Sequence, residues 1–259
     1  MFVRLIKNFL RIFKLEIRRV LIKNPISFKN LPKDKSQFDR WYKLCDGQSL
    51  NVSRDRFLSL FQSMKYIYDN NIEGDFVECG VFMGGSSMMM AYCMKNFKSK
   101  TYKRKLWMYD TFEGMTRPNK DDVNILNENA LKLLNTKKKI ENEKDIWAYS
   151  SLATVIRNLK KTNLNKTQYT FIKGPVEKTL KNKKPNKIAL LRLDTDFYSS
   201  TKSELEFLYS RVEKNGIVLI DDYGHWKGCK KAVDSFFKNK KNIFVHPVDY
   251  SGLIILKIR

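Results

Sequence analysis

The sequence predicts an α/β fold, in which a doubly wound, mostly parallel sheet is covered by helices on both faces. After residue 74, short apolar runs alternate with helical patterns, which is typical of a parallel sheet with right-handed crossovers. The run IALLRLD at 188–194 is almost wholly apolar, as expected of a central strand that is buried on both faces. The last two runs, 242–248 and 252–258, lie close enough together to form an antiparallel C-terminal hairpin.

The remaining elements follow from the same patterns. The first strand, DFVECG at 75–80, leads into a helix at 84–97 that opens with small residues. Further strands are expected at 106–110, 169–174 and 216–222, and further helices at 151–161, from Val176, at 201–212 and at 229–239. The polar stretch 116–147 predicts a lid-like insertion, partly helical around 126–134. We therefore expect one domain over 36–259, preceded by an extension over 1–35.

The extension has the period of a basic amphipathic helix. In residues 1–23 the cationic side chains recur at steps of three and four and form one stripe (Arg4, Lys7, Arg11, Lys14, Arg18). The helix is expected to end near Pro25, because the residue before a proline disfavours helical geometry. Two alternatives remain open: the apolar face packs on the domain or on a second copy, or the helix lies on an anionic membrane surface.

The composition excludes several classes of protein. Among 259 residues, 42% are hydrophobic and 13% aromatic, which excludes intrinsic disorder, and no stretch has the roughly 20 uncharged apolar residues of a spanning helix. The four cysteines have no CxxC spacing and are expected to be reduced thiols of a cytoplasmic protein. The net charge of +23 invites a nucleic-acid function, but Lys outnumbers Arg 37 to 13, as an AT-rich genome produces, and we expect no nucleic-acid partner.

A glycine-rich turn follows the first expected strand. The segment Glu78–Ser87, ECGVFMGGSS, runs from a strand end into a helix N-terminus, where glycines allow a ligand to approach the backbone and N–H groups are free. Its spacing differs from the G-x-G-x-x-G of NAD-binding proteins, and an acid at the strand end suits a cationic amino-acid ligand better than a pyrophosphate. Asp110, at the end of the second strand, can accept both hydroxyls of a ribose. Together these features indicate an adenosine-containing ligand without a phosphate requirement.

Four carboxylates follow two neighbouring strands. Asp194-Thr195-Asp196 comes after 188–194, and Asp221-Asp222 comes after 216–220. Carboxylates gathered at one sheet edge repel one another unless a cation neutralises them, and hard oxygen ligands favour Mg²⁺ or a similar ion. Asp194-Thr195-Asp196 is also an Asp-x-Asp motif, so a metal-dependent glycosyltransferase is the alternative function.

These segments resemble, in order, five blocks of the macrocin O-methyltransferase (TylF-like) family. The blocks are GDFVECGVFMGGSSMMM, LWMYDTFEGM, FIKGPVEKTL, LLRLDTDFYSSTKSELEFLY and NGIVLIDDYGHWKGCKKAVDSFF, and they cover about two-thirds of the chain. The resemblance implies a Rossmann-like, seven-stranded class I methyltransferase fold. It also implies an O-methyltransferase that uses S-adenosylmethionine and a divalent metal, and that acts on a sugar hydroxyl.

The resemblance further implies roles for individual residues. The methionine part of S-adenosylmethionine would be held by the turn after the first strand, the ribose by Asp110, and the adenine near the end of the third strand. The implied cofactor-binding residues are Glu78, Gly80, Val81, Phe82, Gly84, Gly85, Ser86, Ser87, Asp110, Thr111, Phe112, Gly174, Val176 and Glu177. The implied metal ligands are Asp194, Asp221 and Asp222, with Asp194 doubling as general base.

Methyl transfer to an alcohol requires removal of the hydroxyl proton, so a base is needed beside the metal. His225 is the second candidate base, Asp196 is expected to bind substrate or the outer shell of the metal, and His246 is expected to be structural. The acceptor is expected to be a small sugar, either nucleotide-activated or a precursor of a surface glycan. We also expect a homo-oligomer that is cytoplasmic, with peripheral contact of residues 1–23 at the inner face of the membrane as one alternative.

Overall fold

The computed structural model of the chain describes residues 35–98, 102–135 and 147–259. The chain divides into two compact units, Met1–Lys35 and Ser36–Arg259, and the fold below is that of the second. The basic amphipathic helix expected at 1–23 and the part of the insertion at 136–146 lie outside the described residues. Within the described ranges, none of the helices has the length and apolar character needed to cross a membrane.

The sheet has seven strands in the order β3-β2-β1-β4-β5-β7-β6. The first five run parallel to one another, whereas β7 is antiparallel to both β5 and β6, which confirms the mixed sheet and its C-terminal hairpin. The strands are β1 (Asp75–Cys79), β2 (Leu106–Asp110), β3 (Tyr169–Lys173), β4 (Ile188–Leu193), β5 (Val212–Ile220), β6 (Ile243–Pro247) and β7 (Leu253–Lys257).

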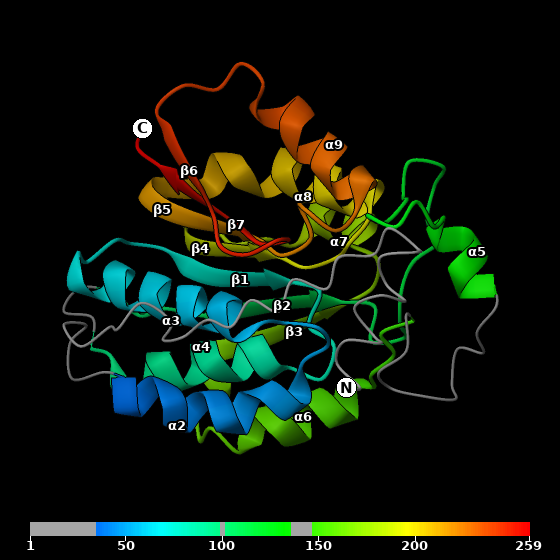
Figure 1. Cartoon of the computed structure of the whole chain (residues 1–259). Coiled ribbons are helices and arrows are strands. Elements are labelled where there is room, and N and C mark those ends of the chain that lie inside the picture. Colours follow the sequence, from blue (N-terminus) through cyan, green and yellow to red (C-terminus); the bar gives the residue numbers. More distant parts are fainter. Residues whose placement is uncertain (1–34, 99–101, 136–146) are drawn as a thin grey trace, which may run out of the picture. The chain divides into compact units, whose positions relative to one another are not determined.

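Helices cover both faces of the sheet (Figure 1). One face carries α2 (Lys35–Cys45), α3 (Arg54–Asp69), α4 (Gly85–Asn96) and α6 (Leu152–Lys160), and the other carries α7 (Val176–Asn182), α8 (Tyr198–Leu208) and α9 (Lys227–Phe237). The short α5 (Ala130–Asn135) belongs to the expected insertion. Short 3₁₀ turns η1 (Asp46–Gln48), η2 (Lys166–Gln168) and η3 (Tyr209–Arg211) complete the described elements.

A hydrophobic core lies on each face of the sheet, and successive side chains of a strand point alternately into one core and the other. In β4, every residue is buried; Leu190 packs in the core under α3 and α4, and Leu191 packs in the opposite core under α8. The all-apolar run at 188–194 is thus the central strand that the sequence predicts.

Some boundaries differ from the sequence prediction. Helix α8 begins at Tyr198 rather than 201 and ends at Leu208, because the chain then turns through η3 and enters β5 four residues before the expected start at 216. Helices α2 and α3 had no sequence assignment; α3 begins at a Ser53 cap, whose side chain accepts the Arg56 N–H.

The carboxyl ends of β1, β4 and β5 meet at the point where strand order reverses. The Asp194 N–H donates to the Cys79 carbonyl at 2.8 Å, and the Asp221 N–H donates to the Leu193 carbonyl at 2.9 Å. Since ligands of open α/β sheets bind outside this switch point, the site is expected in the loops that follow these three strands.

Candidate active site

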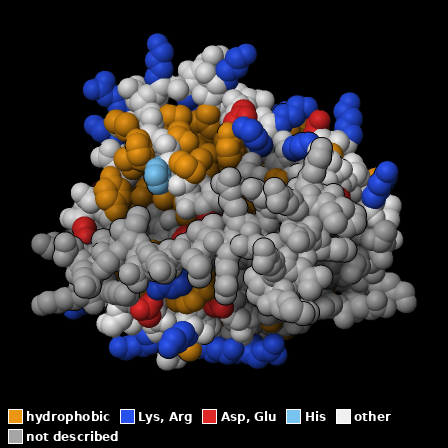
Figure 2. Space-filling model, viewed as in Figure 1, with side chains coloured by type: hydrophobic (Ala, Val, Ile, Leu, Met, Phe, Trp, Pro, Cys, Tyr) orange, Lys and Arg blue, Asp and Glu red, His pale blue; other side chains and the backbone are white. Residues whose placement is uncertain are grey.

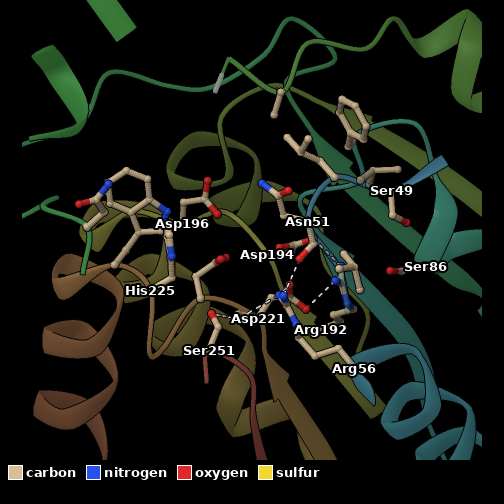
Figure 3. A pocket seen from close by; sticks show the side chains of 18 of the residues that line it. Ser49, Asn51, Arg56, Ser86, Arg192, Asp194, Asp196, Asp221, His225 and Ser251 are labelled. Atoms are coloured by element: carbon tan, nitrogen blue, oxygen red, sulfur yellow. Dashed lines mark hydrogen bonds and ion pairs between the residues drawn. The ribbon is translucent and has the colours of Figure 1, made fainter. Parts of the chain in front are cut away.

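A cavity of about 290 Å³ opens at the switch point. Its wall combines the start of the turn after β1, the ends of β4 and β5, the loop that precedes α3, and the loop between β6 and β7. Figure 3 shows Asp194 and Asp221 beside Arg192 and Arg56, and Asp196 farther along the wall toward His225. Residues distant in sequence therefore share one concave surface, as in most ligand sites of enzymes.

The carboxylates predicted to bind a metal converge at this cavity. One oxygen from each of Asp194, Asp221 and Asp222 lies within 4.8 Å of the others. Asp196 lines the same cavity and has a positive φ of 65°, a conformation that non-glycine residues seldom adopt. The structure thus brings together all four acids that the sequence places at the strand ends.

Arg192, on β4, is a member of this cluster that the sequence analysis missed. It is 3% exposed, and its guanidinium donates to Glu78 at 2.9 Å, to Asp194 at 2.7 Å and to Asp221 at 2.7 Å. The signal was present in the sequence, because one arginine stands inside an otherwise apolar central strand and has to be paired there.

Arg56, on α3, is the second missed cation. Its guanidinium forms ion pairs with Asp221 and with Asp249, the latter at 3.0 Å, and both partners lie more than 160 positions away in the chain. Ser251 adds a hydrogen bond of 2.6 Å from its hydroxyl to the Asp221 carbonyl. Helix α3, the end of β5 and the loop before β7 are therefore joined at the cavity wall, and no local sequence pattern indicates this.

Burial dominates the electrostatics of the cluster. It raises the pKa values of Asp194 and Asp222 well above their ordinary range, and it raises the pKa of Asp196 to about 7. Burial alone would lower the pKa of Arg192, but Asp194, Asp221 and Glu78 outweigh it and keep this guanidinium charged. Each carboxylate is therefore in a position where an added positive charge would favour its ionised form.

The donor set fits a divalent cation. The wall contains four carboxyl groups against two guanidiniums, so negative charge remains in excess after the ion pairs form. Asp222 Oδ2 is buried and has no hydrogen-bond partner in the described part of the chain. A hard cation at the Asp194–Asp221–Asp222 group would satisfy this oxygen and reduce the repulsion.

A smaller cavity of about 60 Å³ adjoins the first and shares Phe82, Ala148 and Asp194 with it. Its wall contains several of the predicted cofactor residues: Gly80, Phe82, Asp110, Thr111, Gly174, Val176 and Glu177. Glu177 Oε2 is buried without a partner among the described residues, as expected of an acceptor that a ligand satisfies. Val81 and Ser86 line the larger cavity.

Asp110 also organises the turn after β1. Its Oδ2 accepts the N–H groups of Val81 at 2.7 Å and Phe82 at 3.1 Å, and its Oδ1 accepts the N–H of Phe112 at 2.7 Å. Both phenylalanines have positive φ angles, 51° and 53°. The carboxylate therefore holds two strained turns at the cavity, in addition to the ribose contact that the sequence predicts.

The other predicted cofactor residues lie behind the cavity wall. Glu78 is buried and accepts hydrogen bonds from Ser87 and Arg192. A Cβ on Gly85 would lie 2.7 Å from the carbonyl oxygen of Cys45 at the end of α2, and one on Gly84 would lie 3.2 Å from Val155 on α6. These glycines allow α2 and α6 to pack close to the turn, so their first role in the structure is packing.

His225, the second candidate base, lines the larger cavity. Burial, and then the charge of Arg56, lower the pKa of this imidazole, so it is neutral at pH 7 and able to accept a proton. Its Nδ1 is buried and has no hydrogen-bond partner in the described ranges. His246 lies on the exposed strand β6, where its ring stacks on Phe244.

The strand order, the antiparallel last strand and a site at the β1–β4 switch point define a class I methyltransferase fold. Residues 47–254 match the model of the macrocin O-methyltransferase (TylF) family, and the chain belongs to that family.

Individual relatives agree with this assignment. The chain is 30% identical over 181 residues to demethyldecarbamoylnovobiocin O-methyltransferase of Streptomyces niveus, a match that covers 70% of this chain and 64% of the relative. It is 30% identical over 185 residues to 8-demethyl-8-(2,3-dimethoxy-alpha-L-rhamnosyl)-tetracenomycin-C 4'-O-methyltransferase of Streptomyces olivaceus, covering 71% and 66%. The chain thus matches slightly less than two-thirds of the length of these relatives.

Among solved structures, the O-methyltransferase NovP superposes with a TM-score of 0.72 at 24% identity. The superposition covers 86% of this chain and 99% of NovP, and it establishes the shared fold.

Proposed function

We propose that this protein transfers a methyl group from S-adenosylmethionine to a hydroxyl of a sugar, with assistance from a divalent cation. The observation that carries the proposal is the group of four carboxylates beside the turn after β1, in a chain of the macrocin O-methyltransferase family. The sugar acceptor is supported by the name of the relative that acts on a rhamnosyl-bearing tetracenomycin.

S-adenosylmethionine would occupy both cavities. The small cavity between Asp110 and Glu177 would take its adenosine, and the turn near Ser86 would take its methionine part. The sulfonium and ammonium groups are cationic, and the acids at this sheet edge favour positive charge. The methyl would then face the larger cavity, where the acceptor enters.

The cation would be held by Asp194, Asp221 and Asp222. As a Lewis acid, it would lower the pKa of the acceptor hydroxyl. Arg192 and Arg56 keep Asp221 oriented from two sides. The hydroxyl proton passes to a base on the cavity wall, and Asp194, Asp196 and His225 are the candidates there. Held in the two cavities, S-adenosylmethionine would supply the methyl group, which the acceptor oxygen would take as the carbon–sulfur bond breaks to leave S-adenosylhomocysteine.

The glycosyltransferase alternative accounts for fewer residues. Asp194 and Asp196 would bind Mn²⁺ and a nucleotide sugar, but Asp110, Glu177 and the turn after β1 would have no role. Three expectations remain predictions. The protein forms a homo-oligomer; it is cytoplasmic, with membrane contact of residues 1–23 as one of two alternatives; and its acceptor is a surface-glycan precursor or a nucleotide-activated sugar.

Ligand binding tests the proposal first. S-adenosylhomocysteine should raise the melting temperature of the full chain, whereas NAD, or UDP with Mn²⁺, should not, because only a ligand that binds the native state stabilises it. A shift with UDP and Mn²⁺ instead would favour the glycosyltransferase.

Removal of the metal tests whether methyl transfer depends on a divalent cation. EDTA should abolish transfer of labelled methyl to a sugar, and Mg²⁺ should restore it. Asp222→Asn should lower the rate at least 100-fold and weaken Mn²⁺ binding, measured by electron paramagnetic resonance. Asp234→Asn, at an exposed acid of α9 paired with Lys230, is the matched control and should do neither. Full activity after EDTA treatment would remove the metal from the mechanism.

A further inference from the structure

Strand β6 forms one edge of the sheet and exposes apolar side chains. Phe244 is 55% exposed and Val245 is 45% exposed. Seven large hydrophobic side chains are exposed in the described ranges, and four of them belong to the β6–β7 hairpin, its turn or the residue after it (Phe244, Val245, Tyr250, Ile258). Figure 2 shows hydrophobic side chains gathered over this side of the sheet. A concentration of exposed apolar side chains indicates a docking surface.

The strand register explains why the apolar surface reaches the edge. Phe244 lies opposite Leu256 on β7, and Leu256 lies opposite Ile217 on β5. Residues that lie opposite one another share a face of the sheet, so the three side chains form one row. Helix α3 packs on β4 and β5, and along the row Ile217 is buried, Leu256 is half-buried and Phe244 is exposed. The apolar face therefore continues beyond the helix that covers its centre.

Four exposed cations border this apolar edge. They precede β6 or follow β7 (Lys238, Lys240, Lys241, Arg259). The Ile258 N–H donates to the Asn242 carbonyl at 2.9 Å, so both groups of cations lie at the same end of the hairpin. Between residues 235 and 259 the single acid is Asp249, and it is paired with Arg56. The hairpin thus presents apolar side chains and uncompensated positive charge together.

The charge of the edge favours an anionic partner over a second copy of the chain. If β6 paired antiparallel with β6 of another copy, the lysines of each would lie beside His246 and Pro247 of the other and would meet no acid there. Pro247 also lacks the N–H that a continued ladder needs. An anionic lipid surface fits better, because lipid phosphates pair with Lys and Arg while apolar side chains enter below the headgroups without needing a complementary groove.

We propose that the β6 edge docks on an anionic membrane surface, with Phe244 and Val245 inserted among the lipids and the four cations against the headgroups. The turn of the same hairpin contributes Tyr250 and Ser251 to the larger cavity, so docking would hold that cavity close to the headgroups. This inference goes beyond the proposed function and does not depend on it. The surface is also separate in sequence from residues 1–23, for which membrane contact is one of two alternatives.

Vesicle co-sedimentation of the full chain tests the docking surface. Vesicles of phosphatidylcholine with phosphatidylglycerol should bind the wild type at least 10-fold more tightly than phosphatidylcholine alone, and high salt should weaken the binding. The double variants Phe244→Ser/Val245→Ser and Lys238→Glu/Lys241→Glu should each lower the partition coefficient at least 10-fold. Equal binding of both vesicle types, or unchanged binding of both double variants, would overturn the proposal.

A matched variant controls for net charge. Lys160→Glu/Lys166→Glu makes the same change in charge at exposed positions of α6 and η2, so it should lower binding by less than about 3-fold. A loss equal to that of Lys238→Glu/Lys241→Glu would mean that overall charge, and not the β6 edge, directs the binding.

A fluorescent label locates the contact. All four cysteines of the chain are buried, so a cysteine introduced on the surface can be labelled selectively with a polarity-sensitive dye. The dye should shift to shorter wavelength with anionic vesicles at Val245→Cys but not at Lys166→Cys, which precedes the strand at the opposite edge of the sheet. A shift at Val245→Cys that grows with protein concentration in the absence of vesicles would show that a second copy covers the edge, and would overturn the proposal.

Charge reversal at Arg11 and Lys14 separates this surface from residues 1–23. If that variant loses vesicle binding while the two hairpin variants bind as the wild type does, residues 1–23 make the contact and the proposal is wrong. The melting-temperature shift with S-adenosylhomocysteine should be the same in all variants and reports that each is folded. Failure of the wild type to bind S-adenosylhomocysteine would count against the proposed function and leave the membrane surface unaffected.

Discussion

At the scale of single residues, Arg192 has the largest number of charged partners in the site. Its guanidinium contacts Glu78, Asp194 and Asp221, and all four side chains belong to the strands of the switch point or to the residues that follow them. A buried charge network of this kind costs desolvation, and it is tolerated only while its members stay paired. Arg192 therefore keeps the cluster assembled before any cation binds.

Replacing Arg192 by methionine tests this role. Arg192→Met keeps the length of the side chain but leaves three carboxylates without their cation, so we expect a loss of about 3–5 kcal/mol in the free energy of unfolding. The loss should be smaller at pH 5, where protonation relieves the unpaired acids. Urea unfolding at pH 5 and pH 8 measures both effects.

Arg157→Met is the control for Arg192→Met. Arg157 is exposed on α6, and its replacement should change stability by about 0.5 kcal/mol or less. Equal losses at both positions, or a loss at Arg192 that is independent of pH, would contradict the pairing argument.

At the scale of elements, the site depends on how closely β1 approaches β4. Gly80 follows β1 with a φ of 84°, and a Cβ there would lie 1.8 Å from the Asp194 carbonyl oxygen. The sequence predicts Gly80 as a point where a ligand nears the backbone. In the structure, a glycine is required at position 80 because the end of β4 lies so close. The close approach of Gly80 to the Asp194 backbone sets the position of Asp194.

Gly80→Ala should therefore separate the ends of β1 and β4. We expect a loss of about 3 kcal/mol or more in stability, from the left-handed backbone and the clash together, and weaker binding of S-adenosylhomocysteine. Thermal unfolding with and without S-adenosylhomocysteine measures both.

Gly47→Ala provides the comparison, because a Cβ at Gly47 would meet nothing within 4 Å. This variant should be as stable as the wild type, or slightly more so. A Gly80→Ala protein with wild-type stability and ligand binding would show that the close approach is not required.

At the scale of the whole molecule, the chain is strongly basic whereas the candidate site is rich in acids. On the face shown in Figure 2, Lys and Arg side chains are spread around the periphery rather than gathered in one patch. The four acids that line the larger cavity lie at the carboxyl edge of the sheet, in a chain of net charge +23. The local charge of the candidate site is thus opposite in sign to that of the chain as a whole.

Burial of acids also gives the whole domain a pH dependence. Glu204 on α8 is fully buried, and burial raises its pKa from 4.5 to about 8. Between these values the unfolded chain has lost a proton that the native chain keeps, so stability falls as pH rises from about 4.5 to 8.

Glu204→Gln isolates this effect, since the amide has the same shape and can still accept the hydrogen bond from Thr195. The variant should gain stability relative to the wild type as pH increases through that window, by up to several kcal/mol at about 1.4 kcal/mol per unit of pKa shift. Urea unfolding at pH 5, 6.5 and 8.5 checks this. A difference that stays constant with pH would mean that Glu204 ionises normally.

The sequence by itself determined the strand–helix alternation, the central position of 188–194, the terminal hairpin and the acids at the strand ends. These features depend on local periodicity and on the rule that parallel strands end at one edge, so they can be predicted without tertiary contacts. Helix boundaries such as that of α8 depend on capping and on the turn that follows, which local periodicity does not encode.

Only the tertiary structure decided which residues pair with those acids. Arg56 reaches Asp221 and Asp249 across more than 160 positions, and Asn51 and Tyr250 meet one cavity from loops 199 residues apart. Such contacts depend on how α3 and the terminal hairpin pack on the sheet, and the packing is specified by the shapes of the buried side chains, which carry no periodic signal along the chain.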